Sequence, residues 1–65
     1  MYRLKLFSNI FGVDDRGPMH PTREEARKAA QKMLLFHHGK VRIEIHRIID
    51  LRTRKTEKIE EIGQQ

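Results

Sequence analysis

The chain has no cysteine and no tryptophan, and it has no long run of apolar residues. Without cysteine, a disulfide framework, thiol catalysis and a cysteine-based zinc site are excluded. A membrane-spanning helix needs about 20 apolar residues. A secretory signal needs a continuous apolar run of about 7–15 residues before a small-residue cleavage site. Neither pattern is present, so we expect a soluble, cytoplasmic protein that has no membrane partner.

The chain has 65 residues, with 14 Lys and Arg against 9 Asp and Glu, which gives a net charge of +5. This length predicts one small domain, assigned to residues 1–62, with a disordered tail at 63–65. A single core of this size rarely supplies more than about 3–5 kcal/mol of stability. The size therefore favours either well-idealised packing or an added partner, such as a second copy in a homodimer.

Two segments alternate apolar and polar residues, as half-buried strands do, and a third, highly charged segment suits an exposed edge strand. In the first, Tyr2, Leu4 and Leu6 alternate with basic residues, and in the second the alternation runs from Val41 past Ile45. If this alternation continues along the second segment, Arg47 points inward and Ile48 outward. We therefore expect either a bulge near His46–Arg47 or Arg47 at the rim of the core. The expected strands are 2–8, 40–51 and 56–62, with the last two joined by a hairpin turn at 52–55.

One segment, residues 22–38, has the pattern of a helix. Thr22 and Glu25 form a capping box at its start, and Gly39 supplies the left-handed residue expected after its end. The apolar stripe predicted to face the sheet is Ala26, Ala29, Ala30, Met33, Leu34 and His37.

The connection 9–20 is long for so small a domain. Its Gly, Asp and Pro residues are turn signals. We expect it to be a loop whose apolar residues cap one end of the core, with a short extra strand near 10–13 as the alternative. Those apolar residues are Ile10, Phe11, Val13 and Met19.

These elements predict an α+β fold in the order β-α-β-β. The architecture is a two-layer sandwich in which one helix packs on one face of a three-stranded sheet. If the first two strands are neighbours, the helical connection between them makes them parallel with a right-handed crossover. The other face of the sheet is then open to solvent or to a partner.

Metal and phosphate-loop chemistry find little support in the residues. Of the four histidines, His37 and His38 are adjacent on the expected helix and point about 100° apart, so they cannot share an ion. No HxxxH spacing is present, and Gly12-x-x-x-x-Gly17 lacks the Lys-Ser/Thr of a phosphate loop. We therefore expect no metal and no cofactor.

Catalysis is equally unsupported. Ser8 is the only serine, Thr22 serves as a helix cap, and adjacent Asp14 and Asp15 are typical of a turn. One helix on three strands can hardly enclose a water-excluding pocket. We therefore expect a non-catalytic protein with no small-molecule substrate.

The basic residues give the main functional prediction. Residues 40–58 alone carry a net charge of +4, with 7 basic and 3 acidic residues. The outward positions of the first two strands and the hairpin turn could form one basic surface, with Phe7 interleaved as in platforms that bind phosphates and stack a base. The sequence thus predicts a nucleic-acid-binding accessory or regulatory protein. Its candidate binding residues are Arg3, Lys5, Arg42, Arg52, Arg54, Lys55 and Lys58.

The alternative is a protein-interaction or adaptor domain. The open face of the sheet would present Phe7 and Ile48 as apolar contacts, and the first or last strand would offer an unpaired edge. Either surface could bind a partner protein or a second copy of the chain. The basic residues would then only keep a small domain soluble.

Overall fold

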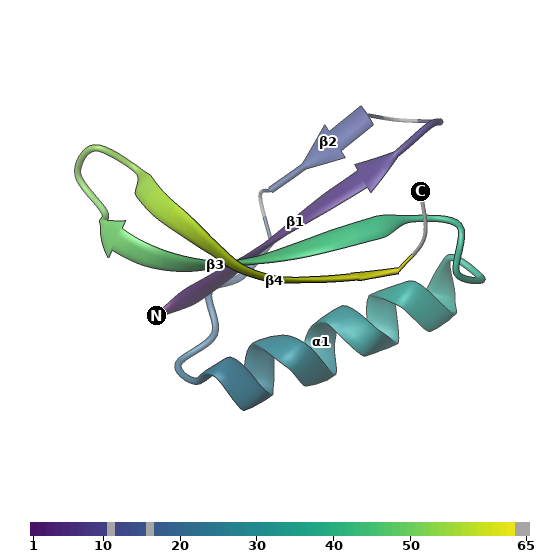
Figure 1. Ribbon diagram of the computed structural model, residues 1–65, viewed down its shortest axis with the longest axis horizontal. Coiled ribbons are helices and arrows are strands. Elements are labelled where there is room, and N and C mark those ends of the chain that lie inside the picture. The colour runs from purple at the N-terminus through teal and green to yellow at the C-terminus, as the bar shows by residue number, and fades with distance from the viewer. Residues whose placement is uncertain (11, 16, 64–65) are drawn as a thin grey trace.

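The computed structural model describes residues 1–10, 12–15 and 17–63. Its elements are β1 (Tyr2–Ser8), β2 (Gly12–Asp14), α1 (Arg23–Phe36), β3 (Arg42–Asp50) and β4 (Lys55–Gly63). The strands form one antiparallel sheet in the order β2-β1-β3-β4, and α1 lies along one face of it (Figure 1). The α+β class is confirmed, but the described sheet has four strands because the connection 9–20 contains β2.

β1 and β3 are antiparallel neighbours, so the conditional expectation of a parallel pair is wrong. The reason lies in the connection after β1. There β2 reverses the chain, and two backbone hydrogen bonds of 2.8 and 2.9 Å then join His20 to Tyr2 at the start of β1. The helix therefore runs in the direction of β1, and β3 begins beside Phe7 and returns.

The helix is capped at its start as its sequence predicts, but it ends at Phe36 rather than at residue 38, so His37 lies just past its end. The Thr22 hydroxyl accepts a hydrogen bond of 3.1 Å from the Glu25 backbone N–H. Ala26 and Ala30 are completely buried, and their small side chains bring α1 close to the sheet. Gly39 has a φ of +73°, the left-handed conformation expected after the helix. No helix among the described residues is long and apolar enough to cross a membrane.

The core lies between α1 and the two central strands. Leu4 pairs with Ile45, and Leu6 pairs with Ile43, so these four side chains share the face of the sheet under the helix. Ile59 and Ile62 of β4 and Met33 and Leu34 of α1 pack around them, partly buried. The buried apolar residues are Leu4, Leu6, Ala26, Ala30, Val41, Ile43 and Ile45.

The connection does not cap the core as expected. Ile10 is 93% exposed, Val13 57% and Met19 37%. β2 pairs only with β1 at the edge of the sheet, and Val13 pairs with Phe7, on the face away from α1. Phe11 lies outside the described residues. Gly63, expected in the tail, is the last residue of β4, and residues 64–65 are not described.

Two irregularities interrupt the β3–β4 pairing. Ile45 pairs with Glu60 but His46 with Lys58, which leaves Ile59 as an extra residue in β4. The bulge expected in β3 at His46–Arg47 is therefore in the partner strand. β3 itself stays regular against β1 as far as Arg47, which lies exposed at the rim and pairs with Glu57 at 2.7 Å. The second irregularity leaves Ile49 as an extra residue between Ile48 and Asp50.

A matched pair of substitutions tests this account of the core. Ile45→Val should lower the free energy of unfolding by about 0.5–1.5 kcal/mol, because Ile45 is fully buried. Ile49→Val removes the same methylene group from a side chain that is 50% exposed, and should change stability by less than about 0.5 kcal/mol. Urea denaturation measures both, and equal losses would contradict the packing described here.

Candidate functional site

The face of the sheet opposite α1 carries polar and charged side chains in neighbouring rows. On β1 the residues of this face are Arg3, Lys5 and the aromatic Phe7, which alternate with the core residues. Their pairing partners on β3 are His46, Glu44 and Arg42 respectively. This uncovered side of the sheet is called the open face below.

A carboxylate sits at the centre of the open face. Glu44 is only 8% exposed, and it forms a hydrogen bond of 2.9 Å with His46 Nε2 and an ion pair with Arg42. Lys58 Nζ lies 3.7 Å from the Glu44 carboxylate and 2.7 Å from Glu61. Arg42 and Lys58, two of the predicted nucleic-acid-binding residues, are thus engaged with carboxylates of their own chain.

This network sets the charge state of Glu44. Burial by itself raises the pKa of the Glu44 carboxyl. The hydrogen bonds from His46 and Arg42, together with the charges of Lys58 and Arg42, outweigh burial and hold the pKa below its ordinary value. Glu44 is therefore a buried anion that is fully compensated by its neighbours.

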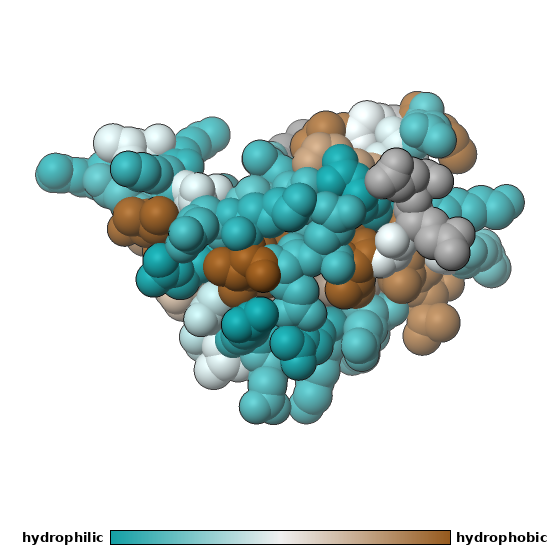
Figure 2. Space-filling view, in the orientation of Figure 1, coloured by the Kyte–Doolittle hydropathy of each residue, from teal (hydrophilic) through white to brown (hydrophobic). Residues whose placement is uncertain are grey.

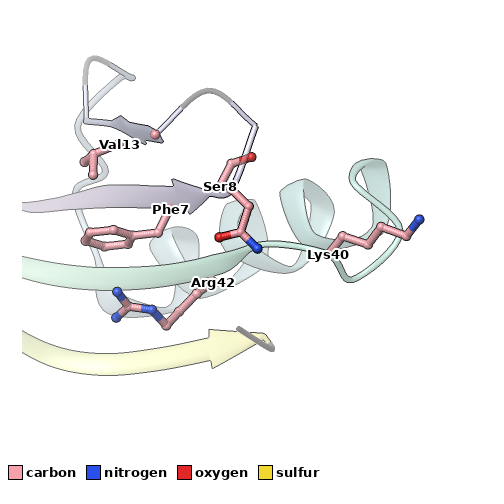
Figure 3. Close-up of a pocket in the computed structure, with 7 residues that line it drawn as sticks. Phe7, Ser8, Val13, Lys40 and Arg42 are labelled. Carbon is pink, nitrogen blue, oxygen red and sulfur yellow. The ribbon is translucent and has the colours of Figure 1, made fainter.

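The ring of Phe7 is already covered. The Arg42 guanidinium lies over it, 4.0 Å from the ring centre, in a cation–π contact (Figure 3). Val13 and Lys40 help to line a cavity of about 280 Å³ beside this pair. The interleaved aromatic predicted as a base-stacking residue thus has one face occupied by an arginine.

Five of the seven predicted binding residues have no acidic partner among the described residues. Other cations are paired, and Arg23 and Arg27 of α1 bind Glu60 at 3.3 and 3.0 Å. Outside the predicted set, Lys28, Lys32 and Lys40 also lie more than 4.0 Å from any described carboxylate. The five predicted binding residues in this position are Arg3, Lys5, Arg52, Arg54 and Lys55. We call them the unpaired cations.

Three of the unpaired cations lie on a projecting hairpin. The pairing of β1 with β3 ends where Tyr2 lies opposite Arg47. One further hydrogen bond of 2.9 Å runs from the Ile48 N–H to the Met1 carbonyl. Residues 49–55 therefore extend past the sheet as a two-stranded arm (Figure 1), and mostly hydrophilic atoms cover it (Figure 2). Arg54 has a φ of +59°, a strained conformation for a side chain of this size.

Arg54 of the arm lies close to the open face. Arg54 lines a small cavity together with Arg3, Lys5 and Asp15, while His46 and Thr56 form the rest of its wall. Strand pairing had placed Arg3 and Lys5 on this face, but the turn decides that Arg54 joins them. Arg52 and Lys55 are exposed.

The two predicted protein-interface residues lie on the open face but are half-buried. The Arg42 guanidinium lies over the ring of Phe7. Ile48 lines a cavity together with Arg3, Leu51 and Arg54. β1 is an interior strand, so the first strand offers no unpaired edge. The edges of the described sheet are β2 and β4, and β4 is the last strand, as expected.

A different apolar surface lies at the end of α1. Ile10 is 93% exposed, and Leu35 and Phe36 are each 78% exposed. Sequence reasoning missed this surface, although a signal was present. Leu35 and Phe36 are apolar residues off the helical stripe, and such residues are expected in solvent. A cavity of about 420 Å³ lies between Phe36 and Ile10.

In the described part of the chain, no three His, Asp or Glu side chains lie close enough together to bind a metal ion. No family model matches the chain, and comparison with curated proteins and with solved structures finds no match either.

The Glu44 network predicts a pH-dependent stability. The folded pKa lies below the unfolded one, so the ionised carboxylate stabilises the fold above about pH 4.5, and this contribution is lost as the pH falls through the folded pKa. Glu44→Gln should cost about 1–3 kcal/mol of unfolding free energy at neutral pH. The difference from wild type should shrink below pH 4.5.

The matched control is Glu57→Gln, which breaks an ion pair whose two side chains are each 54% exposed. It should cost less than about 1 kcal/mol, because exposed pairs contribute little. Urea denaturation at neutral and acidic pH measures both variants. A Glu44→Gln loss that persists unchanged in acid would rule out this origin.

Proposed function

We propose that the protein is a non-catalytic module that binds nucleic acid through the phosphate backbone. The observation that carries the proposal is the position of the unpaired cations. Arg52, Arg54 and Lys55 lie on the arm, and Arg3 and Lys5 lie on the open face beside it. Five basic side chains without an acidic partner among the described residues therefore lie on the arm and on the open face beside it.

Backbone contact fits this surface better than base stacking. A sequence-independent platform for single strands stacks bases on exposed aromatic rings. Here Arg42 covers Phe7, and Tyr2 packs against the core on the opposite face. Basic side chains without acidic partners, in contrast, release counterions when they meet phosphates, which favours binding at low salt.

An alternative is supported by a different observation. The exposed side chains of Ile10, Leu35 and Phe36 at the far end of the molecule are typical of a surface covered by a partner protein. A second copy of the chain would serve equally, and would also add buried area to a small core. This alternative replaces Phe7 and Ile48 with other residues as the main apolar contacts.

The salt dependence of binding tests the nucleic-acid proposal. Contact with four to five phosphates gives a log–log salt slope of roughly −4 for a DNA duplex. The triple variant Arg52→Ala, Arg54→Ala and Lys55→Ala should flatten this slope by about two to three units. Fluorescence anisotropy with a labelled duplex over about 50–300 mM salt measures it.

The control is the double variant Lys28→Ala and Lys32→Ala. It removes two exposed cations of α1, which also lack an acidic partner among the described residues but lie on the covered side of the sheet. Its slope should match wild type. If both variants flatten the slope equally, binding is diffuse and the arm is not the site.

Sedimentation equilibrium tests the alternative. If the apolar end mediates self-association, Phe36→Ser should dissociate the oligomer while leaving the fold intact, because Phe36 is 78% exposed. Ile48→Glu, on the open face, should leave the mass unchanged. A wild-type protein that is monomeric at all concentrations would exclude the homodimer, and dissociation by Ile48→Glu alone would return the interface to the open face.

A further inference from the structure

The small cavity between the arm and the open face has the composition of an anion site. Its volume is about 70 Å³, and three unpaired cations, Arg3, Lys5 and Arg54, form its wall. A cavity of this size suits a group of a few atoms rather than a base or a sugar. Its one acidic group is Asp15, which forms no ion pair with Arg3 or Lys5 within 4.0 Å.

Arg3 supplies an independent observation. Its Nε is buried and has no hydrogen-bond partner among the described residues. A buried donor left unsatisfied is unfavourable, and more so when it belongs to a charged group. An oxyanion in the cavity would accept from a guanidinium in this position and remove that cost.

The hydrogen bonds of His46 connect this cavity to pH. The Glu44 carboxylate, 2.9 Å away, can only accept, so Nε2 of His46 carries a proton. In neutral His46 the other nitrogen, Nδ1, is then an acceptor, and the Thr56 hydroxyl at 3.2 Å donates to it. The hydroxyl proton of Thr56 is therefore unavailable to a ligand in the cavity.

Protonation of His46 reverses this arrangement. Nδ1 then also carries a proton and donates to the Thr56 oxygen, which releases the hydroxyl proton to point elsewhere. The cavity would gain both a donor and a positive charge. The charged groups around His46 that contribute to this balance are Glu44, Arg42, Lys58, Arg3, Lys5, Arg54 and Asp15.

We infer that this cavity binds one phosphate group through Arg3, Lys5 and Arg54. The affinity of the cavity for phosphate rises when His46 is protonated, because the Thr56 hydroxyl then becomes a donor. The inference rests on the proposed nucleic-acid function, in which the group is a backbone phosphodiester. The same chemistry would serve a free phosphate ion. A phosphodiester does not titrate near neutral pH, so any pH dependence belongs to the protein.

The first experiment measures the affinity of the full chain for a labelled DNA duplex at about pH 8 and about pH 5.5, the range in which histidine titrates. Arg3→Gln should weaken binding about five- to tenfold at both pH values. Asp15→Asn should strengthen binding at both, because it removes the one carboxylate from the cavity wall. A purely structural role for these residues does not predict opposite signs.

Thr56→Val tests the link to His46. At the higher pH it should leave the affinity unchanged, because the hydroxyl donates to His46 there. At the lower pH it should show a smaller gain in affinity than wild type. The matched control is Thr53→Val in the exposed turn, which should keep the full gain. Equal gains in the two variants would overturn the pH link.

The second experiment separates the phosphate source, by titrating inorganic phosphate into the protein and following the backbone amides. Shifts at Arg3, His46, Arg54 and Thr56 without duplex binding would keep the site and overturn the nucleic-acid function. Duplex binding that Arg3→Gln and Asp15→Asn leave unchanged would overturn the site and keep the function. If neither probe binds, both proposals fail.

Discussion

The packing of α1 on one face of the sheet is the constraint on which the rest of the structure depends. Ala26 and Ala30 are completely buried and allow the helix to lie close above Ile43 and Ile45. With a single helix among the described residues, only one face of the sheet can be covered. The other face carries charged groups that compensate one another, as Glu44 and Arg42 do.

The distribution of carboxylates decides which basic side chains are compensated. Glu44 and Glu61 hold Arg42 and Lys58 on the open face, and Glu60 holds the two arginines at the start of α1. None of these three carboxylates lies within 4.0 Å of a basic side chain of the arm. The basic side chains of the arm are therefore not compensated by these acids, which gives this part of a small domain a positive electrostatic surface.

The candidate site was only partly predictable. Alternation along the first strand places Arg3 and Lys5 outward, and it places Phe7 beside them. The covering of Phe7 by Arg42 depends on the antiparallel register of β1 and β3, which the sequence pattern does not contain. The cavity also joins Arg3 to Arg54, residues 51 positions apart in the chain, through a turn that the sequence marks only as a loop.

Local patterns were enough to determine α1, its Thr22 cap, the buried face of each central strand and the basic character of the hairpin, because these depend on spacing within a few residues. The tertiary structure decided the direction of β3, the position of the extra residue at Ile59 and the ion-pair partner of each charged side chain. The direction of β3 follows from the short strand β2, which reverses the chain after β1. Because of that reversal the helix runs in the direction of β1 and β3 returns antiparallel to it, and no spacing within a few residues of the sequence indicates this.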